Sequence, residues 1–161
     1  MALTAPEVVS TVNDLVNDEA VLQDLTRETI QDRWPDIPLV RPEDAAQHLF
    51  DISLQYDFTL FEYFQTDVAG HSLDYERACR VLREYDRFLS ALVRFTAAAG
   101  ITVVMTADHG NIEDMSSRTH TMKPVPFIVL GPHEEEMRER VGSLVDVTPM
   151  ILESFNKNRN R

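Results

Sequence analysis

The sequence lacks a second cysteine, because Cys79 is the single one among 161 residues. An intramolecular disulfide is therefore excluded. The sequence also has no run of about 18 apolar residues, which is the length that a membrane-spanning helix needs. Its first residues lack the basic start and apolar stretch that are typical of a secretory signal peptide. We therefore expect a cytoplasmic protein with no transmembrane helix.

Positive charge is scarce as well. The chain has 15 Lys and Arg against 27 Asp and Glu, which gives a formal net charge of −12 and a pI near 4.7. Nucleic acids and anionic lipids are bound mainly by basic side chains that neutralise phosphate, so this balance argues against both as partners. The hydrophobic share of 43% and the charged share of 26% are ordinary for a globular protein. We expect a folded chain without a nucleic-acid or membrane partner.

Residues 1–56 are predicted to form a helical segment, the remnant of a preceding or cap region. Apolar residues recur at helical spacing over Thr11–Trp34, which favours one long helix there. The prolines of Trp34–Pro38 would end that helix. A second helix is predicted to begin at Pro42, whose acidic neighbours suit a helix N-terminus, and to end near Tyr56.

Residues 57–155 have a different pattern and are predicted to form a metal-binding α/β domain. A polar, frayed tail is expected over residues 156–161. The order of the expected elements indicates a mostly parallel sheet with flanking helices. These elements are a strand at Phe58–Phe64, a helix at Leu73–Ala99 stopped by Gly100, strands at Ile101–Thr106 and Val125–Leu130, a solvated helix at Glu134–Arg140, and a last helix capped by Asp146.

Side chains of the metal-binding type follow the predicted strands. Asp67 and His71 come after the first strand, Asp108 and His109 after the second, and His120 lies in the following loop. Ligands in open α/β sheets bind beyond the carboxyl ends of the strands, so these side chains are expected to meet. Imidazole and carboxylate together suit Zn²⁺ or Mn²⁺.

Each of these residues alone has a plainer explanation. An Asp after a strand is often only a helix cap, and a lone histidine, such as His48 or His133, is more often an ordinary polar group than a ligand. The joint pattern of five residues favours metal binding. Glycines beside the ligands are expected to allow sharp turns, and Asn111 and Glu113 are candidate partners of the ligating histidines.

Three motifs and a closing helix resemble the alkaline phosphatase superfamily, especially the branch of cofactor-independent phosphoglycerate mutase and phosphopentomutase. The resemblance covers about residues 57–155 and indicates the C-terminal portion of an alkaline-phosphatase-like core. The matching pieces are Asp67-x-x-Gly70-His71, Thr106-Ala107-Asp108-His109-Gly110-Asn111, His120-Thr121-x-x-Pro124-Val125-Pro126-Phe127-Ile128, and Leu144-Val145-Asp146-Val147-Thr148-Pro149-Met150-Ile151-Leu152.

The resemblance implies a phosphoryl-transfer site with two divalent ions, Mn²⁺ or Zn²⁺, acting on a small phosphate ester. Asp67, His71 and His120 would hold one ion, and Asp108 with His109 would contribute to the other. The family's Ser or Thr nucleophile and a further Asp ligand come from an N-terminal segment with its own strands. Thr4, Ser10 and Thr11 lack the apolar run of such a strand, so no nucleophile is assigned, and the missing N-terminal part is an expected partner.

Three functions remain open from the sequence. The first is a metal-dependent phosphomutase (an isomerase) or phosphatase (a hydrolase), of which this chain carries most metal ligands. The second is a non-catalytic metal-binding or interaction module. The third is an inactive truncated relic, which would expose strand edges and apolar surface.

Overall fold

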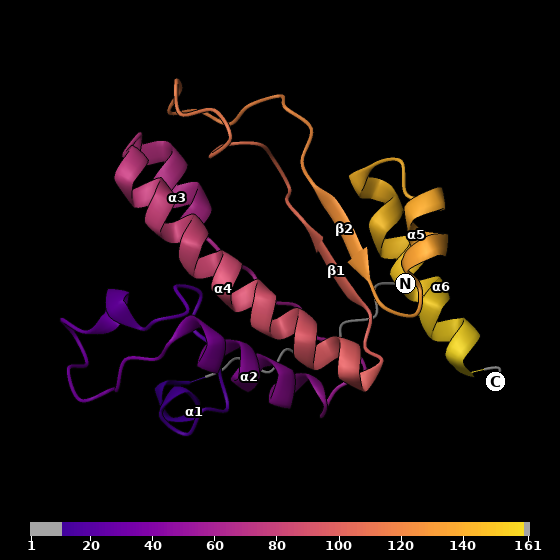
Figure 1. Ribbon diagram of the computed structural model, residues 1–161, viewed down its shortest axis with the longest axis horizontal. Coiled ribbons are helices and arrows are strands. Elements are labelled where there is room, and N and C mark those ends of the chain that lie inside the picture. The colour runs from indigo at the N-terminus through magenta and orange to yellow at the C-terminus, as the bar shows by residue number, and fades with distance from the viewer. Residues whose placement is uncertain (1–10, 160–161) are drawn as a thin grey trace. The chain divides into compact units, whose positions relative to one another are not determined.

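The computed structural model describes residues 11–159, and the side chains of residues 11–156 (Figure 1). Thr4, Ser10 and most of the predicted frayed tail lie outside these described side chains. The described chain contains helices α1 (Val12–Val16), α2 (Pro42–Ser53), α3 (Gln65–Ser72), α4 (Tyr75–Ala99), α5 (Glu134–Arg140) and α6 (Leu144–Arg159), the 3-10 helix η1 (Glu28–Ile30), and strands β1 (Val103–Thr106) and β2 (Phe127–Leu130). No helix in this part of the chain combines the length and apolar character needed to span a bilayer.

The chain forms two compact units, and it passes between them more than once. Unit 1 comprises the described residues up to Gln65 together with Cys79–Leu92, and unit 2 comprises Thr66–Ala78 and Val93–Arg161. The middle of α4 therefore belongs to unit 1 and its two ends belong to unit 2. The boundaries predicted at residues 56 and 155 remain predictions.

The long helix predicted over Thr11–Trp34 is wrong beyond its first turns. Only α1 is α-helical, and the chain then runs through turns to η1. The carboxylate of Asp24 accepts hydrogen bonds from the backbone N–H of Arg27, at 2.8 Å, and of Thr29, at 2.7 Å. Such bonds compete with helical ones, which explains why the helical spacing does not produce a helix. Leu15, Ala20 and Ile37 form the buried cluster of this region.

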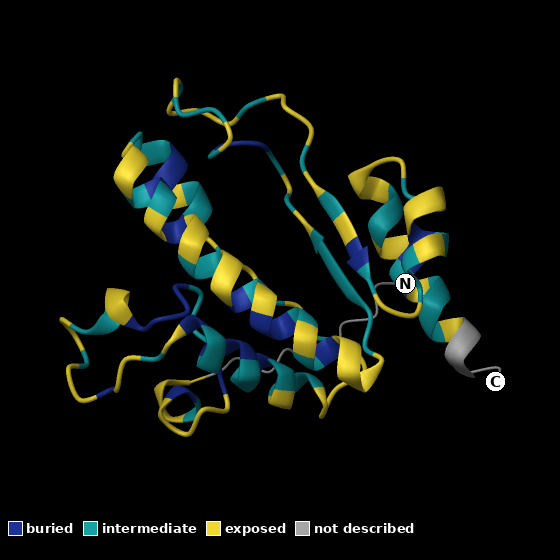
Figure 2. Cartoon of the chain, viewed as in Figure 1, coloured by how far each residue is buried: buried dark blue, intermediate teal, exposed yellow. Residues whose placement is uncertain are grey.

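The strand predicted at Phe58–Phe64 is not a strand of the described structure. Two of its aromatic rings pack instead on α4, with the Phe61 and Phe88 ring centroids 5.5 Å apart and the Tyr63 and Tyr85 centroids 4.5 Å apart. Phe88 is among the most deeply buried side chains, and Figure 2 shows the buried positions along α4. Ring packing on a helix thus holds a segment whose composition favours a strand.

Unit 2 contains the sheet, which consists of β1 and β2 in the described residues. The two strands pair antiparallel, with Val104 opposite Val129, so the α/β character is present but the mostly parallel sheet is not confirmed. Met137 of α5 and Met150 of α6 are buried against Val129, and Figure 1 shows both helices beside β2. The chain returns from β1 to β2 through a loop rather than a crossover helix, and a return of this kind places strands antiparallel.

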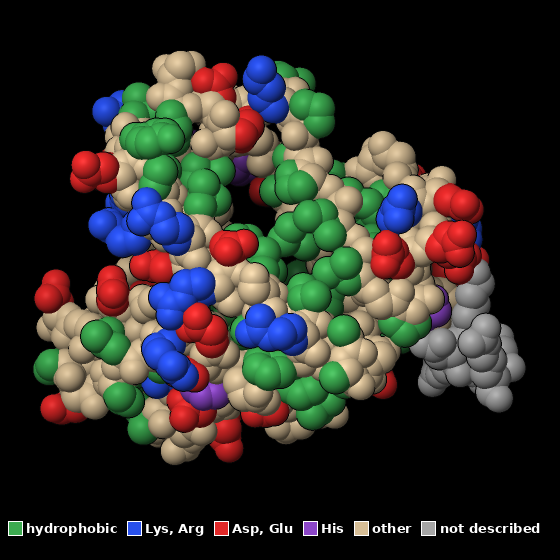
Figure 3. All heavy atoms as spheres, in the orientation of Figure 1, with side chains coloured by type: hydrophobic (Ala, Val, Ile, Leu, Met, Phe, Trp, Pro, Cys, Tyr) green, Lys and Arg blue, Asp and Glu red, His purple; other side chains and the backbone are tan. Residues whose placement is uncertain are grey.

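Several predicted elements are confirmed with small shifts. The long helix α4 begins one residue after its cap Asp74 and ends at Gly100, which has the left-handed backbone of a C-cap. The helix α5 is solvated as predicted, and Figure 3 shows acidic and basic side chains over it. The helix α6 starts at Leu144, so the prediction of Asp146 as its N-cap is wrong. Asp146 lies in the first turn, where its side chain accepts from the backbone N–H groups of Gly142 and Ser143.

Candidate metal centre

Asp67 and His71 lie on one face of α3. They are four residues apart, which is about one helical turn, so their side chains point the same way. The Nε2 atom of His71 is 3.2 Å from Oδ1 of Asp67. The prediction that both follow a strand is wrong, but the i, i+4 spacing itself brings the two ligand atoms together.

Two further histidines approach the same carboxylate oxygen from the segment between β1 and β2. The Nε2 atoms of His120 and His109 lie 3.8 Å and 3.9 Å from Oδ1 of Asp67. Ligand atoms of Asp67, His71 and His120 all lie within 4.8 Å of one another. Asp108 behaves differently, because its side chain is 88% exposed and its ion-pair contact among the described residues is with His109, at 3.6 Å. The structure thus gathers four of the five predicted side chains around one atom.

The atoms of this cluster fit a divalent cation. Oδ1 of Asp67 is buried and accepts no hydrogen bond from the described residues. A carboxylate oxygen in this position costs free energy unless a donor or a cation faces it. Nitrogen and oxygen ligands of a tetrahedral Zn²⁺ are about 3.3 Å apart, close to the 3.2 Å between His71 and Asp67. Imidazole and carboxylate are ligands that Zn²⁺ and Mn²⁺ accept.

The ring of His71 is oriented by Arg118. Its Nδ1 atom lies 2.5 Å from the backbone carbonyl oxygen of Arg118. A carbonyl oxygen only accepts, so Nδ1 carries a proton, and in the neutral ring the lone pair lies on Nε2, the atom nearer Asp67. The Arg118 guanidinium donates in return to the backbone oxygen of His71, at 3.2 Å. This exchange sets the tautomer that metal binding through Nε2 requires.

Gly70 allows α3 to approach the loop after β1. A Cβ atom at Gly70 would overlap Oδ1 of Asn111 and lie 2.6 Å from its Cγ. Asn111 is buried, and its Nδ2 atom is 3.4 Å from Nε2 of His71. The predicted sharp turn at this glycine is wrong, because Gly70 is helical and close packing is what requires it. Asn111 does contact a candidate ligand, as its selection from the sequence anticipated.

The hydrogen bonds of Glu113 among the described residues go to Asn111 and Thr121, on the two sides of the loop, rather than to a histidine ring. Its carboxylate accepts hydrogen bonds from the Thr121 hydroxyl and from the backbone N–H of Asn111. The bond from Thr121 is the main cause that lowers the pKa of Glu113, so its carboxyl is anionic at neutral pH. The sequence analysis did not select Thr121 or Arg118, because neither has a side chain of the metal-binding type.

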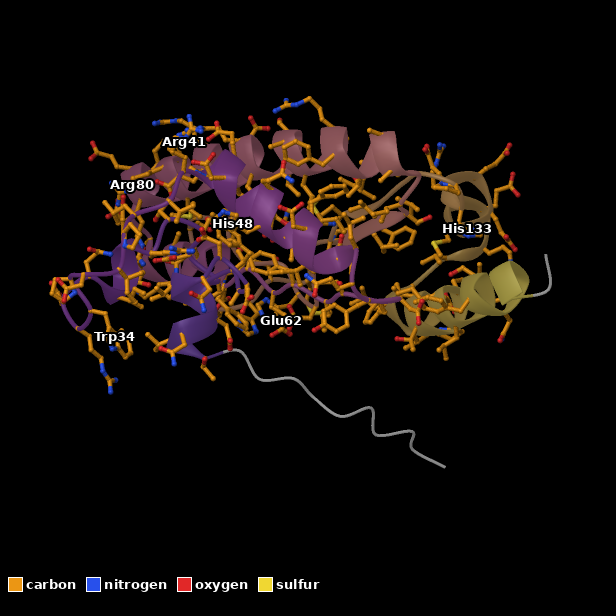
Figure 4. The ribbon with its side chains drawn as sticks, turned by 90° about the horizontal axis from the view of Figure 1, so that it is seen from below. Trp34, Arg41, His48, Glu62, Arg80 and His133 are labelled. Carbon is orange, nitrogen blue, oxygen red and sulfur yellow. The ribbon has the colours of Figure 1, made fainter. Side chains whose placement is uncertain are left out.

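The two remaining histidines lie on other elements. His48 belongs to α2, where its Nδ1 atom is 3.5 Å from Oδ1 of Asp18. His133 directly precedes α5. Figure 4 labels both, and neither belongs to the cluster of Asp67, His71 and His120.

Comparison with known proteins agrees with this cluster. A family model described as the metalloenzyme superfamily matches residues 1–159. The chain belongs to the metalloenzyme superfamily. The resemblance to the alkaline phosphatase superfamily and its mutase branch is therefore confirmed, and membership supports a divalent metal at the cluster.

Curated relatives of this metalloenzyme chain carry the name 2,3-bisphosphoglycerate-independent phosphoglycerate mutase. The one from Desulforudis audaxviator is 33% identical over 74% of this chain and 26% of its own length. Those from Cereibacter sphaeroides and Mycoplasma genitalium are 35% and 30% identical over 72% and 73% of this chain, and 24% and 25% of their own lengths. The chain thus spans about a quarter of the curated relatives it matches. No solved structure matched the chain.

Proposed function

We propose that this chain carries the metal-binding part of a phosphoryl-transfer site that acts on a small phosphate ester. In this proposal Asp67, His71 and His120 hold one divalent ion, and Asp108 with His109 contributes to a second. Mn²⁺ and Zn²⁺ are the proposed ions, because both accept carboxylate and imidazole. The relatives named as phosphoglycerate mutases support a phosphomutase type of reaction.

One observation carries the proposal. The buried Oδ1 of Asp67 accepts no hydrogen bond from the described residues, yet the Nε2 atoms of three histidines lie 3.2–3.9 Å from it. An ion bound there would polarise a phosphoryl oxygen and offset the charge that develops in the transition state. The residues of the chain supply the ligand atoms and orient them, as Arg118 does for His71.

The first experiment measures metal binding by the purified chain after chelator treatment. Titration with Zn²⁺ or Mn²⁺ in a calorimeter should give one ion bound through Asp67, His71 and His120. His71→Ala should weaken the Kd by more than about 100-fold, beyond the 10–100-fold typical of residues that only orient a ligand. The matched control is His133→Ala, which removes an imidazole outside the cluster and should leave the Kd unchanged. An unchanged Kd in His71→Ala contradicts the proposed site.

The second experiment measures turnover, which separates the functions left open by the sequence. Metal-dependent isomerisation or hydrolysis of a phosphate ester, lost in His71→Ala, supports the phosphomutase or phosphatase type. Metal binding without turnover favours the metal-binding module. A chain that neither binds metal nor turns over a phosphate ester, and that aggregates, favours the relic.

A further inference from the structure

The segments that carry His109 and His120 are tied together directly beside the two rings. The backbone N–H of Thr121 donates to the backbone oxygen of Gly110 at 2.8 Å, which forms an isolated bridge between the two segments. Glu113 adds a side-chain connection across the same point. Its Oε2 accepts from the backbone N–H of Asn111 at 2.6 Å, and its Oε1 accepts from the Thr121 hydroxyl.

The bridge between Gly110 and Thr121 lies one residue from each of the two histidines. His109 directly precedes Gly110, and His120 directly precedes Thr121. The two rings are stacked, with centroids 3.5 Å apart and planes inclined by 12°. Both Nε2 atoms face Oδ1 of Asp67, at 3.9 Å and 3.8 Å. The distance between the two segments thus decides whether both rings reach the same carboxylate.

The close packing around Gly110 independently supports a specific contact between the His109 and His120 segments. A Cβ atom at Gly110 would overlap the Thr121 hydroxyl oxygen and lie 2.6 Å from Oε1 of Glu113. Two donors already occupy the two oxygens of Glu113, one on each. Both oxygens of the carboxylate therefore serve the connection between the two segments.

We propose that Glu113 is a positioning residue that clamps the His109 segment to the His120 segment and so sets the spacing of the two imidazoles at Asp67. The clamp is defined as Glu113, Thr121 and the backbone of Gly110–Asn111. Its consequence for metal affinity rests on the function proposed above, whereas its effect on ring geometry does not. Because Glu113 is exposed, its removal leaves no cavity in a core, and we expect the effect at the rings rather than in global stability.

The test compares four variants of the full chain. Glu113→Ala removes both acceptor oxygens, Glu113→Gln keeps one, Thr121→Val removes only the hydroxyl at nearly constant volume, and Thr121→Ser restores it. The first measurement, on chelator-treated protein, is the nuclear Overhauser effect between the ring protons of His109 and His120. The second is the Kd for Zn²⁺, and the third is the midpoint of thermal unfolding.

Glu113→Ala and Thr121→Val should lose the ring-to-ring signal and bind Zn²⁺ about 10- to 100-fold more weakly. The ring-to-ring signal and the Zn²⁺ affinity of Glu113→Gln should lie between those of these two variants and those of the unmodified chain. Thr121→Ser should keep both the ring-to-ring signal and the Zn²⁺ affinity. The thermal unfolding midpoints of all four variants should lie within a few degrees of that of the unmodified chain. Rescue by serine is the outcome that a purely structural role of Thr121 does not produce.

The outcomes separate this inference from the proposed function. A ring signal and a Zn²⁺ affinity that stay unchanged in Glu113→Ala overturn the clamp, even if His71→Ala abolishes binding and so upholds the metal site. A ring signal lost in Glu113→Ala, in a chain that binds no Zn²⁺ at all, upholds the clamp and overturns the proposed function.

Discussion

At the scale of single residues, the contact between Gly70 and Asn111 decides how close α3 lies to the loop after β1. The space for a Cβ atom at Gly70 is taken by the Asn111 side chain, and the backbone nitrogen of Ile112 would be 3.1 Å away. His71, the next residue of α3, depends on this approach for its contacts with Arg118 and Asn111. A single added methyl group there should therefore act on the candidate ligands as well as on packing.

In Gly70→Ala the overpacking should cost about 1–3 kcal/mol, and replacing a helical glycine should offset about 1 kcal/mol of it, so the net destabilisation should reach up to about 2 kcal/mol. The substitution should also weaken Zn²⁺ binding, because α3 is pushed away from His120. Thermal unfolding and metal titration check both effects. Gly142→Ala is the matched control, because a Cβ atom at Gly142 meets only Oδ2 of Asp146, at 3.8 Å, and both readouts should stay near those of the unmodified chain.

The residue types of the site could be selected from the sequence, but their geometry could not. Asp67, His71 and His120 were selected for their chemistry, and the structure places their ligand atoms together, while their role as ligands stays a prediction. The bonds of Glu113 to Asn111 and Thr121 depend on where the loop folds back, and no spacing in the sequence reveals that. Asp108 shows that residue type and motif are not sufficient either. Its carboxylate was selected from the sequence as a candidate ligand, yet its side chain is 88% exposed in the structure.

At the scale of elements, Asp74 is the N-cap of α4 and stabilises the beginning of this helix. The Asp74 side chain accepts a hydrogen bond from the backbone N–H of Arg77 at 3.0 Å, which satisfies one of the free donors of the first turn. Asp74→Ala should lower the free energy of unfolding by about 1 kcal/mol. Asp74→Asn keeps an acceptor oxygen and should lose much less, as chemical denaturation followed by circular dichroism can show. Equal losses in both variants would contradict a stabilising hydrogen bond from Arg77 to the Asp74 side chain and would point to its charge instead.

The elements predicted correctly are those whose signals are local. The helix α4 has a capping Asp74, a long apolar stripe and a stopping Gly100, all visible in the sequence. The predictions at Phe58–Phe64 and Thr11–Trp34 failed because the decisive partners lie elsewhere. Two rings of the first segment, those of Phe61 and Tyr63, pack on α4, and the carboxylate of Asp24 accepts hydrogen bonds from the backbone of the second. Periodicity does not reveal either contact, and strand direction likewise depends on long-range pairing.

At the scale of the whole molecule, α4 is shared between the two units. Its residues Cys79–Leu92 belong to unit 1, where the Arg87 guanidinium pairs with Glu43 at 2.7 Å and Phe88 is 1% exposed. Unit 2 cannot therefore be cut out as one uninterrupted segment without exposing this stretch of α4 to water.

A fragment of residues 66–161 should aggregate or bind a dye for apolar surface, because it carries the unit 1 stretch of α4 without its partners. A fragment ending at Leu92 contains all of unit 1 and is the matched control, which should stay soluble and helical. Light scattering, dye fluorescence and circular dichroism check this expectation. Cooperative unfolding of the 66–161 fragment, with an unchanged Zn²⁺ affinity, would contradict it and would support the domain boundary predicted near residue 56.

The division of α4 between the units also orders events while the ribosome makes the protein. Leu92, the last residue of unit 1, emerges well before His120, so the first unit can close while the nascent chain carries only Asp67 and His71. A growing chain at that stage carries two of the three residues proposed as ligands of one ion, and two ligands would hold an ion only weakly. Under the proposed function, metal loading would therefore wait until the loop that bears His120 has left the exit tunnel.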